Sequence, residues 1–241
     1  MKVAQWCAVV ALGVGGLTHA QVIFTPSTGG FQDITGMPGT IDLNIGLGQF
    51  AVQSTSIGND KFPSGLIKIG YNGTVGSNVG GFISTSNHQP IPTVELFNNE
   101  TAIAVIWDTP DPAVGTTDVL FREFTDDPND LYYIIQWNDL PMGGQGGKAT
   151  FQTRVNGSNA FRTSFYAQLS YQSVSEIGIR GGQAATIGYQ SLVPGVDSVQ
   201  WSFDQQFAVQ NGMDLYLVDV PAPGAAMFVL AGSLGLRRRR R

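Results

Sequence analysis

The chain has 241 residues, which is room for one sizeable domain with short terminal segments. Charged residues make up only 13% of it, against 31 glycines and 12 prolines, and this balance argues against a helical bundle. An apolar fraction of 42%, spread in short runs, is too high for an intrinsically disordered chain.

Charge is divided unevenly along the chain. Lys2 and the five C-terminal arginines hold six of the 13 basic residues, so the rest keeps seven basic side chains against 18 acidic ones, a net charge of −11. An acidic surface repels phosphate backbones, which argues against nucleic-acid binding. Because Cys7 is the only cysteine, the sequence predicts no disulfide framework and no thiolate metal site.

The first 20 residues have the three parts of a signal peptide. Lys2 supplies a positive start, residues 6–17 form an apolar run, and Thr18-His19-Ala20 provides small residues at a cleavage site. We therefore expect residues 1–20 to be a Sec-type signal peptide, which signal peptidase removes between Ala20 and Gln21.

Residues 21–219 consist of short β-type runs separated by Gly, Asn, Asp and Pro, without a helical period. Residues 40–45 and 66–71 alternate between apolar and polar side chains, which predicts half-buried strands. Further strands are expected at residues 101–107, 131–137, 151–155, 165–171, 184–189, 199–203 and 215–218. About ten strands at regular spacing predict one all-β domain, an antiparallel β-sandwich of jelly-roll type.

Residues able to carry catalysis are sparse. His88 is the only histidine outside the leader; it precedes Gln89-Pro90 in a loop-like segment, and no Gly-x-Ser-x-Gly motif accompanies it. One histidine is also too few for a catalytic zinc site, which commonly uses two or three. The four glutamates, Glu95, Glu100, Glu123 and Glu176, occur singly, without the paired carboxylates of glycoside hydrolases. We therefore expect no catalytic residues and no enzymatic activity.

Two acidic connections carry the strongest chemical signal. Carboxylates and loop carbonyls are the ligands that Ca²⁺ prefers. The candidate calcium ligands are Asp108, Asp111 and Asp118 in one connection and Asp126, Asp127 and Asp130 in the next. Their spacing does not match an EF-hand, and Asp is common in turns, so a calcium site and solvated turns both stay open. No other cofactor is expected.

Aromatic side chains offer a second binding signal. Stacking platforms for sugars are conceivable at Trp107, Trp137, Trp201, Tyr132, Tyr133 and Tyr171. Aromatic residues on strands more often belong to the core. A carbohydrate-binding jelly roll therefore stays an alternative to a purely structural domain.

Residues 220–241 again have three parts. A proline-containing segment, Pro221-Ala222-Pro223-Gly224, leads into the apolar run 225–236, and the chain ends with Arg237, Arg238, Arg239, Arg240 and Arg241. A dozen helical residues cover roughly 18 Å of a hydrocarbon core about 30 Å thick. We expect this segment to enter the membrane only transiently, with the arginines on the cytoplasmic side.

This tail resembles the PEP-CTERM sorting signal of Gram-negative bacteria, which has a Pro-Glu-Pro motif, a short transmembrane-like stretch and a terminal basic cluster. Pro221, Pro223 and Gly224 match the motif region, with Ala222 in place of the family's glutamate, and Arg237 to Arg241 match the basic stop. The resemblance implies an exosortase-type enzyme, removal of the tail, and delivery to the cell surface or the exopolysaccharide matrix.

Several segments of the body resemble a module of secreted bacterial proteins and the nidogen-like extracellular domain. They are Asp33-Ile34, Trp107-Asp108, Tyr132 to Asn138, Thr150-Phe151-Gln152 and Ala185 to Gly188. The family has a second Asp directly after its Trp-Asp pair, whereas this chain has Thr109-Pro110-Asp111. The resemblance implies an extracellular, non-catalytic module suited to adhesion or matrix structure.

The sequence therefore predicts an exported, non-enzymatic protein of the cell surface or extracellular matrix of a Gram-negative bacterium. Its expected partners are the Sec machinery, signal peptidase, an exosortase-type enzyme, the membrane through its tail, and exopolysaccharide. A carbohydrate-binding or carbohydrate-cleaving jelly roll and a calcium-dependent adhesin are the alternatives.

Overall fold

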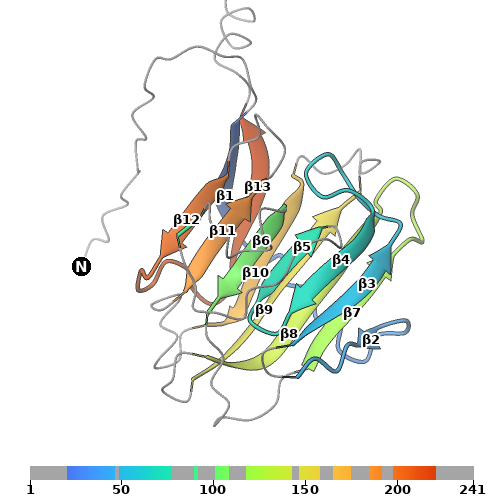
Figure 1. Ribbon diagram of the computed structural model, residues 1–241, viewed down its shortest axis with the longest axis horizontal. Coiled ribbons are helices and arrows are strands. Elements are labelled where there is room, and N and C mark those ends of the chain that lie inside the picture. Colours follow the sequence, from blue (N-terminus) through green and yellow to red (C-terminus); the bar gives the residue numbers. More distant parts are fainter. Residues whose placement is uncertain are drawn as a thin grey trace, which may run out of the picture. The chain divides into compact units, whose positions relative to one another are not determined.

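A computed structural model describes residues 21–46, 49–77, 90–91, 101–108, 118–142, 147–157, 165–174, 185–191 and 198–220. Over these residues the chain is all-β, without a helix, and its strands form two antiparallel sheets (Figure 1). Residues Gln21–Val220 form one compact unit. None of the described segments is a helix long and apolar enough to span a bilayer.

Sheet A has seven strands in the order β1-β13-β10-β9-β8-β7-β2. Their bounds are β1 (Gln21–Thr28), β13 (Met213–Val220), β10 (Ala167–Ser173), β9 (Gly147–Asn156), β8 (Tyr132–Met142), β7 (Asp118–Phe124) and β2 (Ile41–Asp42).

Sheet B has six strands in the order β12-β11-β6-β5-β4-β3. Their bounds are β12 (Val199–Phe203), β11 (Thr186–Gln190), β6 (Ala102–Trp107), β5 (Thr74–Ser77), β4 (Gly65–Gly70) and β3 (Phe50–Thr55).

The core lies between the inner faces of the two sheets. Alternate residues of each strand point inward, as the two-residue period of a strand requires. Sheet A contributes Tyr133, Ile135, Trp137, Phe151, Leu169 and Leu215, and sheet B contributes Ile67, Ile69, Val105, Ile187 and Tyr189, all of them buried.

Two buried aromatic side chains connect the sheets by hydrogen bonds. The indole Nε1 of Trp137 donates to the carbonyl of Gly70 at 3.0 Å, and the hydroxyl of Tyr171 donates to the carbonyl of Val105 at 3.0 Å. Each bond gives a polar atom inside the core a partner, and burial of such an atom without one is costly. Burial also raises the pKa of the Tyr171 hydroxyl.

The tight turn between β4 and β5 requires glycine. Gly73 has φ +79°, and a Cβ at this position would lie 2.3 Å from the carbonyl oxygen of Ile106. Only glycine combines this backbone conformation with so close an approach to β6.

The expected all-β architecture with two antiparallel sheets is confirmed, and the strand at residues 199–203 has the predicted bounds. The strand expected at 40–45 is shorter, because Asn44 has φ +48° and its N–H bonds the side chain of Asp42 in a turn. Four strands were not expected: β1, β3, β5 and β7. Asp118 begins β7 instead of lying within a connection.

The first and last strands of the compact unit are neighbours. β1 pairs antiparallel with β13, and Gln21 lies opposite Val220. Ala20, Pro221 to Gly224 and Arg237 to Arg241, on which the leader and tail predictions rest, lie outside the described residues.

Candidate functional site

The structure spreads the candidate calcium ligands over distant places. Asp118 is the first residue of β7, whereas Asp126, Asp127 and Asp130 follow its last residue. Six strand steps of about 3.3 Å separate the two ends of β7, roughly 20 Å. Calcium ligands lie within about 2.6 Å of their ion, so Asp118 cannot share an ion with the other three.

Asp127 and Asp130 have partners within the fold. The Asp127 carboxylate accepts from the N–H of Asn129, and its carbonyl accepts from the N–H of Asp130, which closes a turn. Asp130 pairs with Arg154 at 2.8 Å. Asp108 is buried at the end of β6, and Asp111 lies outside the described residues. Among the described side chains, no three His, Cys, Asp or Glu converge on a point that suits a metal.

The candidate sugar-stacking aromatics are mostly buried. Trp107, Trp137, Tyr133 and Tyr171 are completely enclosed, and Trp201 is half-buried with its Nε1 bonded to the carbonyl of Ala208. Rings inside the core have no face available to a sugar. The two buried tyrosines share a raised hydroxyl pKa, and burial is the main cause in both.

Tyr132 is half-buried on the outer face of sheet A, but both sides of its ring are covered. Phe124 from β7 stacks on it with centroids 4.4 Å apart, and the guanidinium of Arg154 from β9 lies 3.6 Å from its centroid. Since β7 and β9 flank β8 on opposite sides, the ring of Tyr132 is enclosed between them. This arginine–aromatic stack stabilises the sheet through cation–π contacts. Only the edge of the Tyr132 ring stays accessible, so neither face is available for a sugar to stack on.

A second group on the outer face of sheet A is a row of buried polar side chains on four adjacent strands. We call Gln136, Gln152, Ser170 and Asp214 the polar row. Gln136 lies opposite Gln152, Gln152 opposite Ser170, and Ser170 opposite Asp214. Burial of these four polar side chains without hydrogen-bond partners would lower the stability of the fold.

The partners come from the segment that follows β1. The N–H of Gly30 donates to Asp214 at 2.7 Å, both backbone groups of Gln32 pair with the Gln152 amide at 2.9 Å, and the N–H of Ile34 donates to Gln136 at 3.0 Å. Three alternate residues of the segment, Gly30, Gln32 and Ile34, are therefore bonded to the polar row. We call residues 29–40 the crossing segment, since it leads over sheet A from β1 to β2.

The side chains of the crossing segment add to this attachment. Ile34 is buried against Leu120 and Ile134, and the Gln136 amide also donates to Asp33 at 2.9 Å. That bond, with those from Thr35, lowers the pKa of the Asp33 carboxyl. The motif residues Asp33-Ile34, Gln136 and Gln152, distant in sequence, thus meet at one place.

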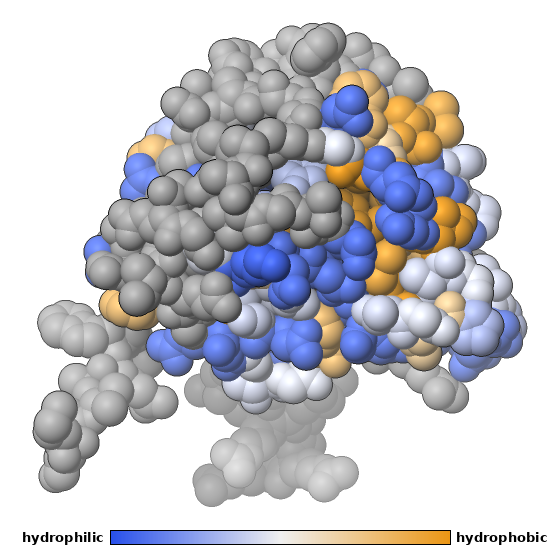
Figure 2. All heavy atoms as spheres, turned by 90° about the horizontal axis from the view of Figure 1, so that it is seen from below, coloured by the Kyte–Doolittle hydropathy of each residue, from blue (hydrophilic) through white to orange (hydrophobic). Residues whose placement is uncertain are grey.

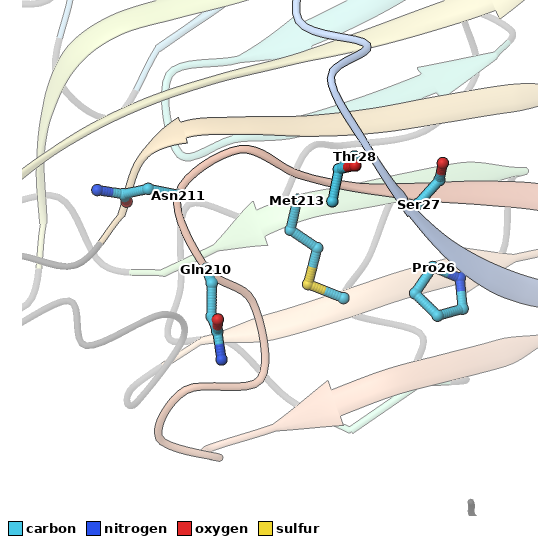
Figure 3. Close-up of a pocket in the computed structure, with 6 residues that line it drawn as sticks. All are labelled: Pro26, Ser27, Thr28, Gln210, Asn211 and Met213. Atoms are coloured by element: carbon cyan, nitrogen blue, oxygen red, sulfur yellow. The ribbon is translucent and has the colours of Figure 1, made fainter. Parts of the chain in front are cut away.

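A pocket of about 420 Å³ lies between the end of β1 and the start of β13 (Figure 3). It is lined by Pro26, Ser27, Thr28, Gln210, Asn211 and Met213. Figure 3 shows the Met213 side chain between Gln210 and Pro26, whereas the Asn211 amide points away, where it accepts a bond from the N–H of Val174. The lining offers hydroxyl and amide groups and no charge.

The end of β13 is held by a small charged cluster. The hydroxyl of Tyr166 donates to Asp219, and the ammonium of Lys61 lies 3.6 Å from the same carboxylate. Burial and the neighbouring carboxylate of Asp219 raise the pKa of Tyr166. The nearby Asn59 amide donates to the carbonyl of Asn156 at 2.6 Å. These contacts hold the last residues of β13 in place.

Glu123 is the one glutamate within the described residues, and it accepts a bond of 2.5 Å from the hydroxyl of Thr55. This contact joins β7 of sheet A to β3 of sheet B. Glu95, Glu100, Glu176 and His88 lie outside the described residues.

Comparison of the chain with protein-family models, curated proteins and solved structures finds no match. The resemblances to the PEP-CTERM signal and to the nidogen-like domain therefore stay predictions from sequence.

Proposed function

We propose that this chain is an exported, non-enzymatic protein of the cell surface or extracellular matrix, sorted through residues 220–241 by an exosortase-type enzyme. It acts by structure or adhesion, and exopolysaccharide is its proposed partner in the matrix. The Sec machinery and signal peptidase act on residues 1–20, and the membrane holds the tail transiently.

The observation that carries the proposal is the pairing of β1 with β13. The compact unit starts at Gln21 and ends at Val220, next to the two expected processing points. The described core residues lie between Val22 and Leu217. Removal of residues 1–20 and of the tail therefore takes no side chain from the described core.

The contacts of the described carboxylates support a structural role. Asp130 pairs with Arg154, Glu123 with Thr55, and Asp214 with Gly30. A general acid–base pair needs carboxylates that face a substrate, and these three face partners within the fold. The enclosed aromatic rings also count against sugar stacking as the main activity.

We also propose the jelly-roll type for the sandwich. The chain passes from sheet A to sheet B after β2 and after β10, and it returns to sheet A after β6 and after β12. Such repeated exchange is a property of double-sheet Greek-key architectures.

The test is the intact mass of the protein recovered from its host. The full-length gene is expressed in the native bacterium, and surface, medium and inner-membrane fractions are analysed by mass spectrometry. We expect a surface or released species that starts at Gln21 and ends within Pro221 to Gly224, with or without an added group.

A matched variant separates processing from folding. Replacement of Pro221 and Pro223 by alanine changes the proposed motif and leaves the compact unit unaltered, so we expect the tail to be retained. Wild-type protein that keeps all five arginines and stays in the inner membrane would overturn the sorting proposal.

A further inference from the structure

The four edge strands of the described sheets differ in how their open sides are protected. An edge strand presents unpaired N–H and C=O groups, and proteins usually blunt it with proline, charge, a bulge or a very short length. β1 contains Pro26, β2 has two residues, and the pairing of β12 shifts register at Ile187/Gly188. β3 has the uncharged sequence Phe-Ala-Val-Gln-Ser-Thr and an unbroken register with β4.

Alternate residues of β3 direct their backbone groups away from β4. The N–H of Tyr71 donates to the carbonyl of Gln49, so residues in phase with Gln49, such as Ala51, bond to β4 in the antiparallel ladder. The N–H and C=O groups of Phe50, Val52 and Ser54 consequently point to the open side of the strand.

Exposed apolar side chains occur on β3, β4 and β2, and Lys68 lies opposite Val52 on β4, with its ammonium 5.8 Å from the centroid of the Phe50 ring. Phe50 is 42% exposed, Val52 46%, Leu66 on β4 40% and Ile41 on β2 46%. We call these four residues with the open side of β3 the open edge. Figure 2 shows hydrophobic residues gathered on the right-hand side of the molecule, the side on which Figure 1 draws β2, β3 and β4.

We propose that the open edge binds the open edge of a second copy of this chain, through antiparallel pairing of the two β3 strands about a twofold axis at Val52. Opposite residues in such a pair must point to the same face of the sheet. An axis at Val52 meets this condition, because it places Val52 opposite Val52 of the second copy and Phe50 opposite Ser54.

The same register matches the hydrogen-bonding groups that face away from β4. The Ser54 carbonyl also accepts a bond of 3.4 Å from the side-chain amide of Gln53, which the strand pairing replaces. Phe50, Val52 and Ser54 are the residues whose N–H and C=O groups face outward, and in this register each becomes a doubly bonded pair. The two copies of sheet B join into one continuous sheet, on which Phe50 and Val52 of both copies lie on one face, beside Lys68 of each copy.

Charge favours a second copy at this edge over an association elsewhere. Residues 21–219 carry a net charge of −11, so most surfaces of two copies repel each other. β3 contains no charged residue, and two copies meet there without opposing carboxylates. The proposal does not depend on the proposed sorting, because β3 lies within the compact unit.

Sedimentation of the protein recovered after expression of the full-length gene tests the proposal. We expect the particle mass of the wild-type protein to rise from that of one chain to that of two as its concentration increases. Val52→Pro should abolish the doubling, since its ring removes an N–H that points away from β4 and leaves the ladder with β4 intact.

A pair of lysine variants provides the matched control. Val52→Lys places like charges opposite each other on the axis and should also give a monomer. Because the new charge also lies opposite Lys68 of the same chain, this variant counts only where its melting curve shows a kept fold. Ile23→Lys introduces the same charge at an exposed position, 39% accessible, on β1 and should leave the doubling unchanged. Circular dichroism melting of each variant reports whether the fold is kept.

Two results would overturn the proposal. One is a wild-type protein of monomer mass at every concentration. The other is doubling that survives both Val52 variants, or that Ile23→Lys abolishes equally, because association would then use another surface or depend on net charge alone.

Discussion

The end of the sandwich formed by β1 and β12 differs from the end formed by β2 and β3 in how its sheet edges are covered. β1 and β12 lie beside each other (Figure 1), β1 contains Pro26, and the pairing of β12 with β11 has a register shift. At the other end, β3 keeps a regular open side next to exposed Phe50 and Val52. The same architecture therefore protects one pair of edges and leaves the other suited to contact.

The interior does not share this asymmetry. Trp137 bonds Gly70 toward the β3 end, and Tyr171 bonds Val105 toward the β1 end. Each end thus has one aromatic hydrogen bond between the sheets. Differences in stability and association between the two ends should therefore come from the edge strands and the crossing segment.

The largest effect is expected from Trp137→Ala. The side chain is fully buried and stacks on Phe151, with centroids 5.2 Å apart. Its removal should lower the free energy of unfolding by about 3–5 kcal/mol, since a large cavity remains. Chemical denaturation measures this, and a loss no greater than that of Tyr171→Phe would show that the β3 end does not depend on the indole.

Gln136→Ala should detach part of the crossing segment, which links the two ends over sheet A. The N–H of Ile34 would stay buried without its partner, at a cost of about 1–3 kcal/mol. Denaturation gives the loss, and faster proteolysis within residues 29–40 locates it. Gln53→Ala is the control, because the side-chain amide of Gln53 bonds the carbonyl of the neighbouring Ser54 and does not touch the crossing segment.

Tyr171→Phe removes the hydrogen bond between the sheets toward the β1 end and keeps the ring. We expect a loss of about 0.5–1.5 kcal/mol, the range for a single neutral hydrogen bond. Thermal melting monitored by circular dichroism should show a small decrease in Tm. An unchanged Tm would mean that the Val105 carbonyl finds another donor.

The smallest effect is expected from Asp33. Its pKa is lowered from 3.8 in the folded protein by the Gln136 amide and Thr35. The stability that this carboxylate adds is therefore present above pH 3.8 and is lost as the pH falls through the lowered pKa. Asp33→Asn should flatten this acid limb in a pH series of melting curves, whereas an identical limb in both proteins would contradict the assignment.

The strands that sequence reasoning identified have apolar residues that face the core, although β1, which was not expected, also buries Val22 and Phe24 there. β6 and β12 have such patterns, whereas β3 places Phe50 and Val52 on its exposed face and only small or polar residues inward. The apolar residues of β3 therefore do not mark a face that packs against the core, and the strand could not be recognised from them. β7 begins with an aspartate and contains Arg122 and Glu123, which hid it within an acidic stretch.

One residue of the polar row could be recognised from the sequence. Gln136 interrupts the apolar run of β8, and a polar residue inside a buried strand indicates a buried hydrogen-bond partner. The identity of that partner was not predictable, since residues 29–40 have no period and bond the sheet through backbone groups. The separation of Asp118 from Asp126, Asp127 and Asp130 was not predictable either, because β7 lies between them and sequence reasoning did not identify this strand.

The pairing of β1 with β13 has a consequence for the order in which the chain folds. β13 is the only partner of β1 in sheet A and also the strand that joins β1 to β10. The first strand to be synthesised must therefore wait for the last one, across nearly the whole compact unit. Contacts of such long sequence separation form slowly, so β1 should stay unpaired in sheet A until residues 213–220 are free. Late pairing of β1 fits the proposed export, in which the chain crosses a narrow channel before it folds.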